Sequence, residues 1–203
     1  AKKPDLYILG EVWHTSQPWL NGDEFHAVMN YPLSDSIKDY FLRGVKKTSQ
    51  FIDEINSQSM YYRQQISEVM FNLLDSHDTE RILATSKGDV QLVKSALACL
   101  FLQRGTPCLY YGTELELDGG PDPDCRRAMP WERVSESNDM LHFMKELIQL
   151  RKNVSDIIQH GTYSLKEIKP DVVSLAWDYD GQKVQAIFNQ STENYLVDSD
   201  AVA

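Results

Sequence analysis

The sequence predicts an α/β fold in which helices and parallel strands alternate, followed by a smaller antiparallel β region. Short apolar runs alternate with helical patterns at intervals of roughly 20 to 45 residues, which is typical of βα units. Two of these runs end in acidic residues, as at the active-site end of a (β/α) barrel. From Gly161 onward, short alternating runs replace this pattern. We therefore expect one domain over residues 1–155 and a β domain over residues 156–203.

The first strand is expected over residues 6–9, an apolar run between Pro4 and Gly10. An uninterrupted apolar run favours a strand covered on both faces. Glu11 follows at once, so a carboxylate stands just past the end of this strand. Taken alone, Glu11 fits equally well a loop carboxylate bonded to backbone or to an arginine.

Three further parallel strands are expected, each short and each followed by a turn or by charge: 25–31 (ended by Pro32), 71–74 and 108–111. The segments between them carry apolar residues at helical spacing and predict these helices: 34–55 with a break at Gly44, 60–69, 89–103 and 138–152. A polar loop is expected over residues 113–136. In the tail, runs 162–168, 172–179 and 183–189 predict antiparallel strands, and Asp180-Gly181 is a hairpin signal.

Composition excludes several classes of function. The chain has 30 acidic and 20 basic residues, a net charge of −10, which disfavours nucleic acid as a partner. No apolar run approaches the roughly 20 residues that span a bilayer, so no membrane role is expected. Cys99, Cys108 and Cys125 lack paired metal-ligand spacing and favour free thiols in a reducing, cytoplasmic compartment without a metal or cofactor. The N-terminus lacks a signal peptide and opens almost directly on a strand, as an excised piece of a longer protein would.

Five segments carry a family resemblance: GEVWH (10–14), VMNYP (28–32), NLLDSHDTER (72–81), GTPCLYYGTE (105–114) and DPDCRRAMPW (122–131). In this order they resemble the α-amylase glycoside hydrolase family, in its neopullulanase, cyclomaltodextrinase and maltogenic amylase branch. The resemblance implies strands five to eight of a (β/α)8 TIM barrel, followed by the start of the C-terminal β domain. The family's nucleophile segment, G-x-R-x-D-x-x-x-H, finds no match. We therefore expect this chain to be the C-terminal half of a barrel.

The resemblance also implies residue roles. Retaining glycosidases use a carboxylic acid and a carboxylate nucleophile about 5 to 5.5 Å apart. By resemblance Glu11 is the general acid/base, Asp78 is the acid that favours the distorted sugar ring, and His77 donates to the same sugar. From the residues alone, without the other segments, a capping pair at a strand-to-helix turn is the favoured interpretation of His77 and Asp78.

Three further residues are expected to bind substrate. Trp13 offers a flat apolar face to a glucose ring; the alternative is that it fills the core. Asp122 and Arg126 are four residues apart and resemble the family's pair that grips a sugar on the non-reducing side; the alternative is a loop salt bridge. Tyr31, His14 and Arg81 are expected to line the site without an assigned role.

The expected function of the parent protein is hydrolysis or transglycosylation at α-1,4-glucosidic bonds of cyclodextrins, maltooligosaccharides or pullulan. The parent protein could also bind calcium. The isolated chain is expected to be inactive. Alternatives are a catalytically dead binding subunit and a sucrose-acting glucosyltransferase or isomerase on the same scaffold. The expected partners are the α-glucan, the missing N-terminal half and a second copy of this chain. A second copy would cover an open barrel side lined by residues 6–9, Val28, Leu73, Leu74, Leu109 and Tyr110.

Overall fold

The computed structural model describes residue 3 and residues 5–196, and its first sheet is parallel. Four short strands follow one another in chain order: β1 (Leu9–Gly10), β2 (Ala27–Val28), β3 (Phe71–Asn72) and β4 (Thr106–Pro107). β1 pairs with β2 and β3 with β4, and a parallel bridge between Met29 and Phe71 joins the two pairs. These pairings confirm the expected parallel direction of the strands.

The predicted burial of the first strand is wrong. Leu6, Tyr7 and Ile8 are 53%, 47% and 39% exposed, and only Leu9–Gly10 pairs as a strand. The reason is that β1 has β2 on one side and, among the described residues, no strand on the other. Its apolar side chains therefore lie at an uncovered edge.

The other three strands also differ from their predicted bounds: β2 and β3 are shorter than predicted, and β3 ends at Asn72 rather than at residue 74. Pro32 does not end an element, because helix α1 (Tyr31–Ile37) begins one residue before it, and proline suits the first turn of a helix. The fourth strand lies at Thr106–Pro107 rather than over 108–111, although the Cys108 N–H still donates to the Asn72 carbonyl at 2.7 Å. Beyond it the chain enters a turn at Gly112, whose φ is +82°.

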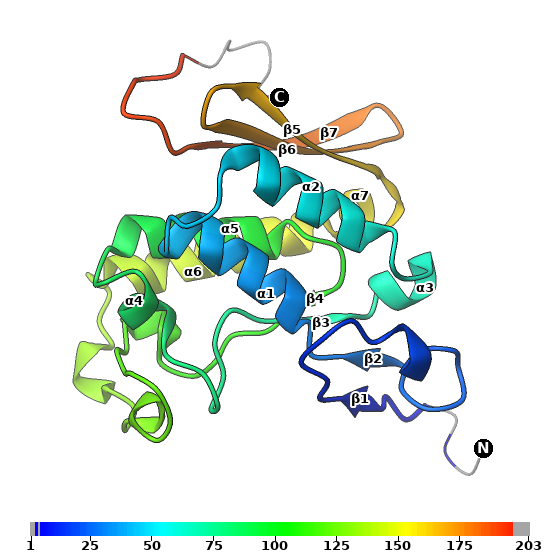
Figure 1. Ribbon diagram of the computed structural model, residues 1–203. Helices are drawn as coiled ribbons and strands as arrows, with labels where there is room; N and C mark the ends of the chain where they lie inside the picture. Colours follow the sequence, from blue (N-terminus) through cyan, green and yellow to red (C-terminus); the bar gives the residue numbers. More distant parts are fainter. Residues whose placement is uncertain (1–2, 4, 197–203) are drawn as a thin grey trace.

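Helices pack against this sheet and against one another (Figure 1). α1 continues into a π-helical segment, η2 (Lys38–Leu42), and Gly44, at φ +62°, lies in the predicted break before α2 (Thr48–Ser59). The predicted helix over 60–69 is reduced to α3 (Gln64–Ser67). The other helices are α4 (Ile82–Thr85), α5 (Val90–Phe101), α6 (Asp139–Asn153) and α7 (Ser155–His160), with 3-10 turns η1 (Gln17–Trp19), η3 (Thr113–Leu115), η4 (Asp124–Arg126) and η5 (Trp131–Arg133). Sequence patterns predicted α5 and α6 and missed α4 and α7.

The tail forms an antiparallel sheet of β5 (Thr162–Lys169), β6 (Val172–Tyr179) and β7 (Gln182–Asn189), as its alternating pattern predicted. This sheet lies over α2 and α7 at the top of Figure 1. Trp177 of β6 is 1% exposed, and its indole N–H donates to the Leu102 carbonyl at the end of α5. The sheet and the helices therefore share one core.

The main core joins α1, η2, α2, α5, α6, α7 and the antiparallel sheet, and a smaller cluster of Leu20, Ala27, Val28 and Met70 lies beside β2. Val28, Leu73 and Leu74 are at most 2% exposed, so they do not line an open side as expected. Within the residues that the structure describes, no helix has both the length and the apolar character needed to cross a bilayer.

Candidate active site

Glu11 stands at the carboxyl end of β1 and is held by a tyrosine from helix α1. Tyr31, the first residue of α1, is 2% exposed, and its hydroxyl donates to Glu11 Oε1 at 3.2 Å. Trp13 stacks on the Tyr31 ring with 3.7 Å between centroids and an interplanar angle of 8°. Because Trp13 is 50% exposed, its side chain also reaches the surface beside Glu11. Tyr31 therefore supports both residues predicted from the first motif.

The loop after β3 brings His77 and Asp78 to the same end of the sheet. The Tyr31 hydroxyl lies 3.4 Å from Ser76 Oγ, and Ser76 Oγ accepts the Asp78 backbone N–H at 3.2 Å. Tyr31 and Ser76 thus connect Glu11 with the Asp78 backbone. His77 Nε2 lies 3.2 Å from Asp78 Oδ2, so the two side chains act as one pair.

Burial, with smaller contributions from the nearby Glu11 and Asp78 charges, raises the pKa of Tyr31 to about 12. Hydrogen bonding to Ser76 acts in the opposite direction. The phenol therefore keeps its proton at neutral pH and remains a donor to Glu11. Burial is the largest of these causes, so it contributes more than the neighbouring charges to keeping the Tyr31 hydroxyl protonated.

Arg126 joins the loop after β4 to this pair. Its Nη2 lies 2.9 Å from Asp122 Oδ1 and 3.2 Å from Asp78 Oδ1, and its Nε donates to the His77 carbonyl at 2.9 Å. The loop salt bridge considered from the sequence is therefore present, and it extends to the predicted acid. The side chains of Asp122 and Arg126 are each 47% exposed, so this network remains open to solvent.

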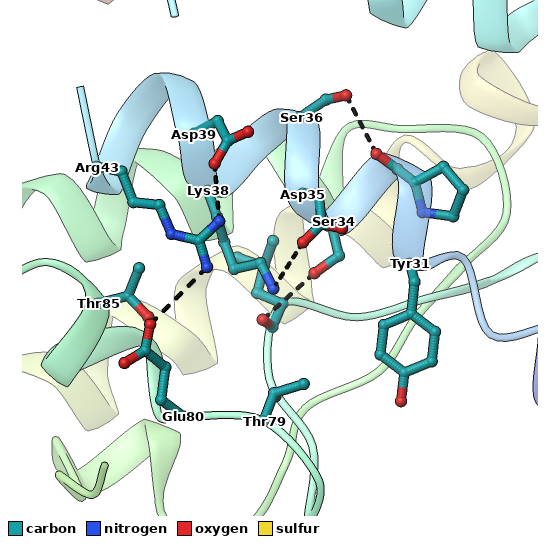
Figure 2. Close-up of polar contacts among 12 residues, drawn as sticks. Tyr31, Ser34, Asp35, Ser36, Lys38, Asp39, Arg43, Thr79, Glu80 and Thr85 are labelled. Carbon is teal, nitrogen blue, oxygen red and sulfur yellow. Dashed lines mark hydrogen bonds and ion pairs between the residues drawn. The ribbon is translucent and has the colours of Figure 1, made fainter. Parts of the chain in front are cut away.

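The loop after β3 is also tied to the helix behind it. Figure 2 shows Arg43, just past η2, between two carboxylates. Arg43 Nη1 lies 2.7 Å from Asp39 and Nη2 lies 3.8 Å from Glu80. In the same view Tyr31 points away from these polar side chains. The helix thus anchors the loop at Glu80 and presents Tyr31 to the site from its other end.

Other residues expected near the site have different surroundings. His14 packs edge-on against Trp19, with 5.6 Å between centroids. Arg81 is 0% exposed and cannot line a substrate site, which corrects the expectation for it. Sequence reasoning missed Ser76; the signal was its place two residues before Asp78, where a serine hydroxyl commonly accepts a backbone N–H. Among the described residues, no group of three or more acidic, histidine or cysteine side chains is placed to hold a metal ion.

Parallel strands with carboxylates just beyond their carboxyl ends are typical of (β/α) enzymes in which acidic side chains form the catalytic site. The model of the α-amylase catalytic domain, "Alpha amylase, catalytic domain", matches residues 1–154. The chain therefore belongs to the α-amylase family of glycoside hydrolases.

Similar proteins include the intracellular maltogenic amylase of Bacillus subtilis, which is 45% identical over 192 residues, covering 94% of this chain and 33% of that protein. A cyclomaltodextrinase structure has a TM-score of 0.85 at 40% identity, covering 92% of this chain and 32% of its own. A cyclic α-maltosyl-(1→6)-maltose hydrolase from Arthrobacter globiformis, solved with maltose, has a TM-score of 0.84 at 32% identity, covering 92% of this chain and 42% of its own. The chain spans about a third of the length of the curated relatives it matches.

Proposed function

We propose that this chain is the C-terminal part of a retaining α-glucan hydrolase or transglycosylase that acts on α-1,4-glucosidic bonds. The observation that carries the proposal is the meeting of Glu11 and the His77–Asp78 pair at one end of a parallel sheet, in a member of this family. Relatives named cyclomaltodextrinase, maltogenic amylase and neopullulanase support cyclodextrins, maltooligosaccharides or pullulan as substrates.

In this proposal β1 to β4 are strands five to eight of a (β/α)8 barrel. Residues 1–155 are the barrel part and residues 156–203 begin the C-terminal β domain. The end of the family match at residue 154 and the start of the antiparallel sheet at Thr162 support this division. The word "intracellular" in the name of a Bacillus subtilis relative supports a cytoplasmic location. The partners are the α-glucan and the N-terminal half of the barrel, which carries the nucleophile.

Glu11 serves as the general acid and base. It gives its proton to the glycosidic oxygen as the bond to the anomeric carbon breaks, and the upstream nucleophile forms the glycosyl-enzyme intermediate. Glu11 then takes a proton from water, or from a sugar hydroxyl in transglycosylation. The hydrogen bond from Tyr31 fixes the position of the Glu11 carboxylate during both steps.

The remaining residues hold the sugar. Asp78 accepts hydrogen bonds from hydroxyls of the reacting ring and favours its positive, flattened transition state, while His77 donates to the same ring. The face of Trp13 that is not stacked on Tyr31 offers an apolar surface to a glucose ring. Asp122 and Arg126 bind the neighbouring sugar on the non-reducing side.

The test compares the complete protein with this chain alone. The complete protein is expected to release reducing sugar from β-cyclodextrin and maltotriose and to leave sucrose unchanged, whereas the chain alone is expected to be inactive because it lacks a nucleophile. Turnover of sucrose in place of α-glucans would support the glucosyltransferase alternative. An inactive complete protein that still binds maltotriose would support a binding subunit. Hydrolysis by the isolated chain would refute the absence of the nucleophile.

A further inference from the structure

Arg81 is the only arginine among the described residues with no exposed surface, and its guanidinium donates to backbone carbonyls of two different segments. Its Nη1 donates to the Tyr111 carbonyl at 2.6 Å, and its Nε donates to the Cys125 carbonyl at 2.8 Å. The Arg81 backbone N–H donates to the Gly119 carbonyl at 2.9 Å. One residue of the loop after β3 therefore binds both the turn after β4 and the following loop.

The rings after β4 enclose the same guanidinium. Arg81 Cζ lies 3.9 Å from the centroid of Tyr110 and 4.6 Å from that of Tyr111. Arg81 Nη2 is buried and has no hydrogen-bond partner among the described residues. A planar, stacked arginine with two fixed carbonyl contacts cannot be replaced by lysine without losing this geometry. The charge is thus held by packing and by backbone carbonyls, away from any substrate.

The segment that Arg81 binds, residues 118–127, carries Asp122 and Arg126. Cys125, which accepts from Arg81 through its carbonyl, donates its thiol to the His77 carbonyl at 3.1 Å. Arg126 Nε donates to the same carbonyl at 2.9 Å. At the far end of the segment, the Tyr111 hydroxyl donates to the Arg127 carbonyl at 2.7 Å. The hydrogen bonds from this segment to the His77–Asp78 pair therefore come from Cys125, which Arg81 holds, and from Arg126, which lies between Cys125 and Arg127.

We propose that Arg81 is a positioning residue, which fixes residues 118–127 against the His77–Asp78 pair and so places Asp122 and Arg126 for sugar binding. The proposal rests on the proposed function. Arg81 does not touch the substrate. It acts through backbone carbonyls, so its loss displaces the polar groups of the site and leaves their chemistry unchanged. A displacement of about 1 Å at such groups lowers catalytic efficiency by as much as about 100-fold.

The test uses the complete enzyme and a double-mutant cycle. Arg81→Met is expected to lower kcat/KM on maltotriose by about 10- to 100-fold. In an Arg126→Ala background the same change is expected to cost about three-fold or less, because the group that Arg81 positions is already absent. If Arg81→Met lowers kcat/KM by the same factor in both backgrounds, Arg81 acts independently of Arg126, through overall stability, and the proposal is overturned.

Arg151 supplies the matched control. It also donates to three backbone carbonyls, those of Phe101, Gln103 and Gly105, at 2.7 Å each, but it lies away from the site. Arg151→Met is expected to lower the melting temperature and leave kcat/KM within about two-fold. An equal kinetic loss in Arg151→Met would refute the inference.

A milder variant covers the case in which Arg81→Met does not fold. Tyr111→Phe removes the hydroxyl bond to Arg127 and keeps the ring against Arg81. It is expected to lower kcat/KM several-fold, again with little further loss in the Arg126→Ala background, and an unchanged enzyme would count against the proposal. Unmodified enzyme without activity on α-glucans would refute the proposed function, whereas an active enzyme with independent losses would refute only the role of Arg81.

Discussion

Replacing Asp75 by asparagine is expected to change how stability depends on pH. Asp75 follows β3 and is 5% exposed, and burial raises the pKa of its carboxyl from 3.8 to about 6. The positive charges of Arg81 and Lys38 and hydrogen bonds from the Ile82 N–H and the Thr113 hydroxyl lower this pKa, but burial outweighs them. The folded chain therefore binds the Asp75 proton more tightly than the unfolded chain does.

The sign and size of the effect follow from this difference. The stabilising contribution of protonated Asp75 is present in full below pH 3.8 and is lost as the pH rises through about 6. A rise of about two pKa units corresponds to about 3 kcal/mol. Asparagine keeps the side-chain shape and an acceptor for the Ile82 N–H but cannot ionise. Relative to the unmodified chain, the free energy of unfolding of Asp75→Asn is expected to rise by about 3 kcal/mol between about pH 3 and pH 7.

Urea unfolding, followed by tryptophan fluorescence at several pH values in this range, measures the difference. Asp124→Asn is the matched control, because Asp124 is exposed and a hydrogen bond from Arg127 lowers the pKa of its carboxyl. The free energy of unfolding of Asp124→Asn is expected to be slightly lower than that of the unmodified chain. This difference should stay constant from about pH 5 to pH 7. A flat or falling difference for Asp75→Asn would mean that Arg81 and Lys38 outweigh burial, and would refute the reasoning.

Three further predictions concern the acid, a chain junction and association. In the complete enzyme, Glu11→Gln is expected to lower kcat by about 10²- to 10⁴-fold with little change in substrate binding, and near-normal turnover in steady-state kinetics would assign the acid elsewhere. Gly161→Ala is expected to destabilise the chain by about 1 to 3 kcal/mol in urea unfolding, because the new Cβ would clash with the Ile157 carbonyl oxygen. Gly120→Ala is the control, because its new Cβ would lie 3.4 Å from the nearest atom, Asp124 Oδ2. This variant should have nearly the stability of the unmodified chain, and an equal loss of stability in both variants would contradict this account. The isolated chain is expected to form dimers or larger oligomers at micromolar concentration in light scattering, and a clean monomer would contradict an open association surface.

The antiparallel tail and the long helices were predictable because their signals are local. Strands β5, β6 and β7 span eight residues each and are separated by turn residues, and α5 and α6 carry apolar residues at helical spacing over 12 and 15 residues. The parallel strands were harder, because each has only two residues with ladder pairing, and β4 precedes the apolar run that predicted it. An apolar run favours a buried strand, but it does not show where backbone pairing begins or ends, and Leu6, Tyr7 and Ile8 are not buried.

For the candidate site, the sequence predicted the acidic residues and not what holds them. Glu11, His77 and Asp78 belong to short motifs, so their numbers could be read directly. Tyr31 was predicted to lie in a strand, yet it starts α1 and reaches Glu11 from 20 residues away. Cys125 reaches the His77 carbonyl across 48 residues, and no local pattern encodes such a contact. Their roles depend on how loops from different strands meet.

The segment before β1 is where the sequence and the structure differ most, and the difference has a physical meaning. Leu6, Tyr7 and Ile8 have the composition of a strand covered on both faces, yet they are 39% to 53% exposed. Native proteins protect an exposed strand edge with charge, proline or a covering segment, and residues 6–8 carry no charge. Apolar side chains at an unpaired edge favour association with another strand. The composition of this segment therefore supports the proposal that a further strand, from the N-terminal half of the barrel, pairs with β1 in the complete enzyme.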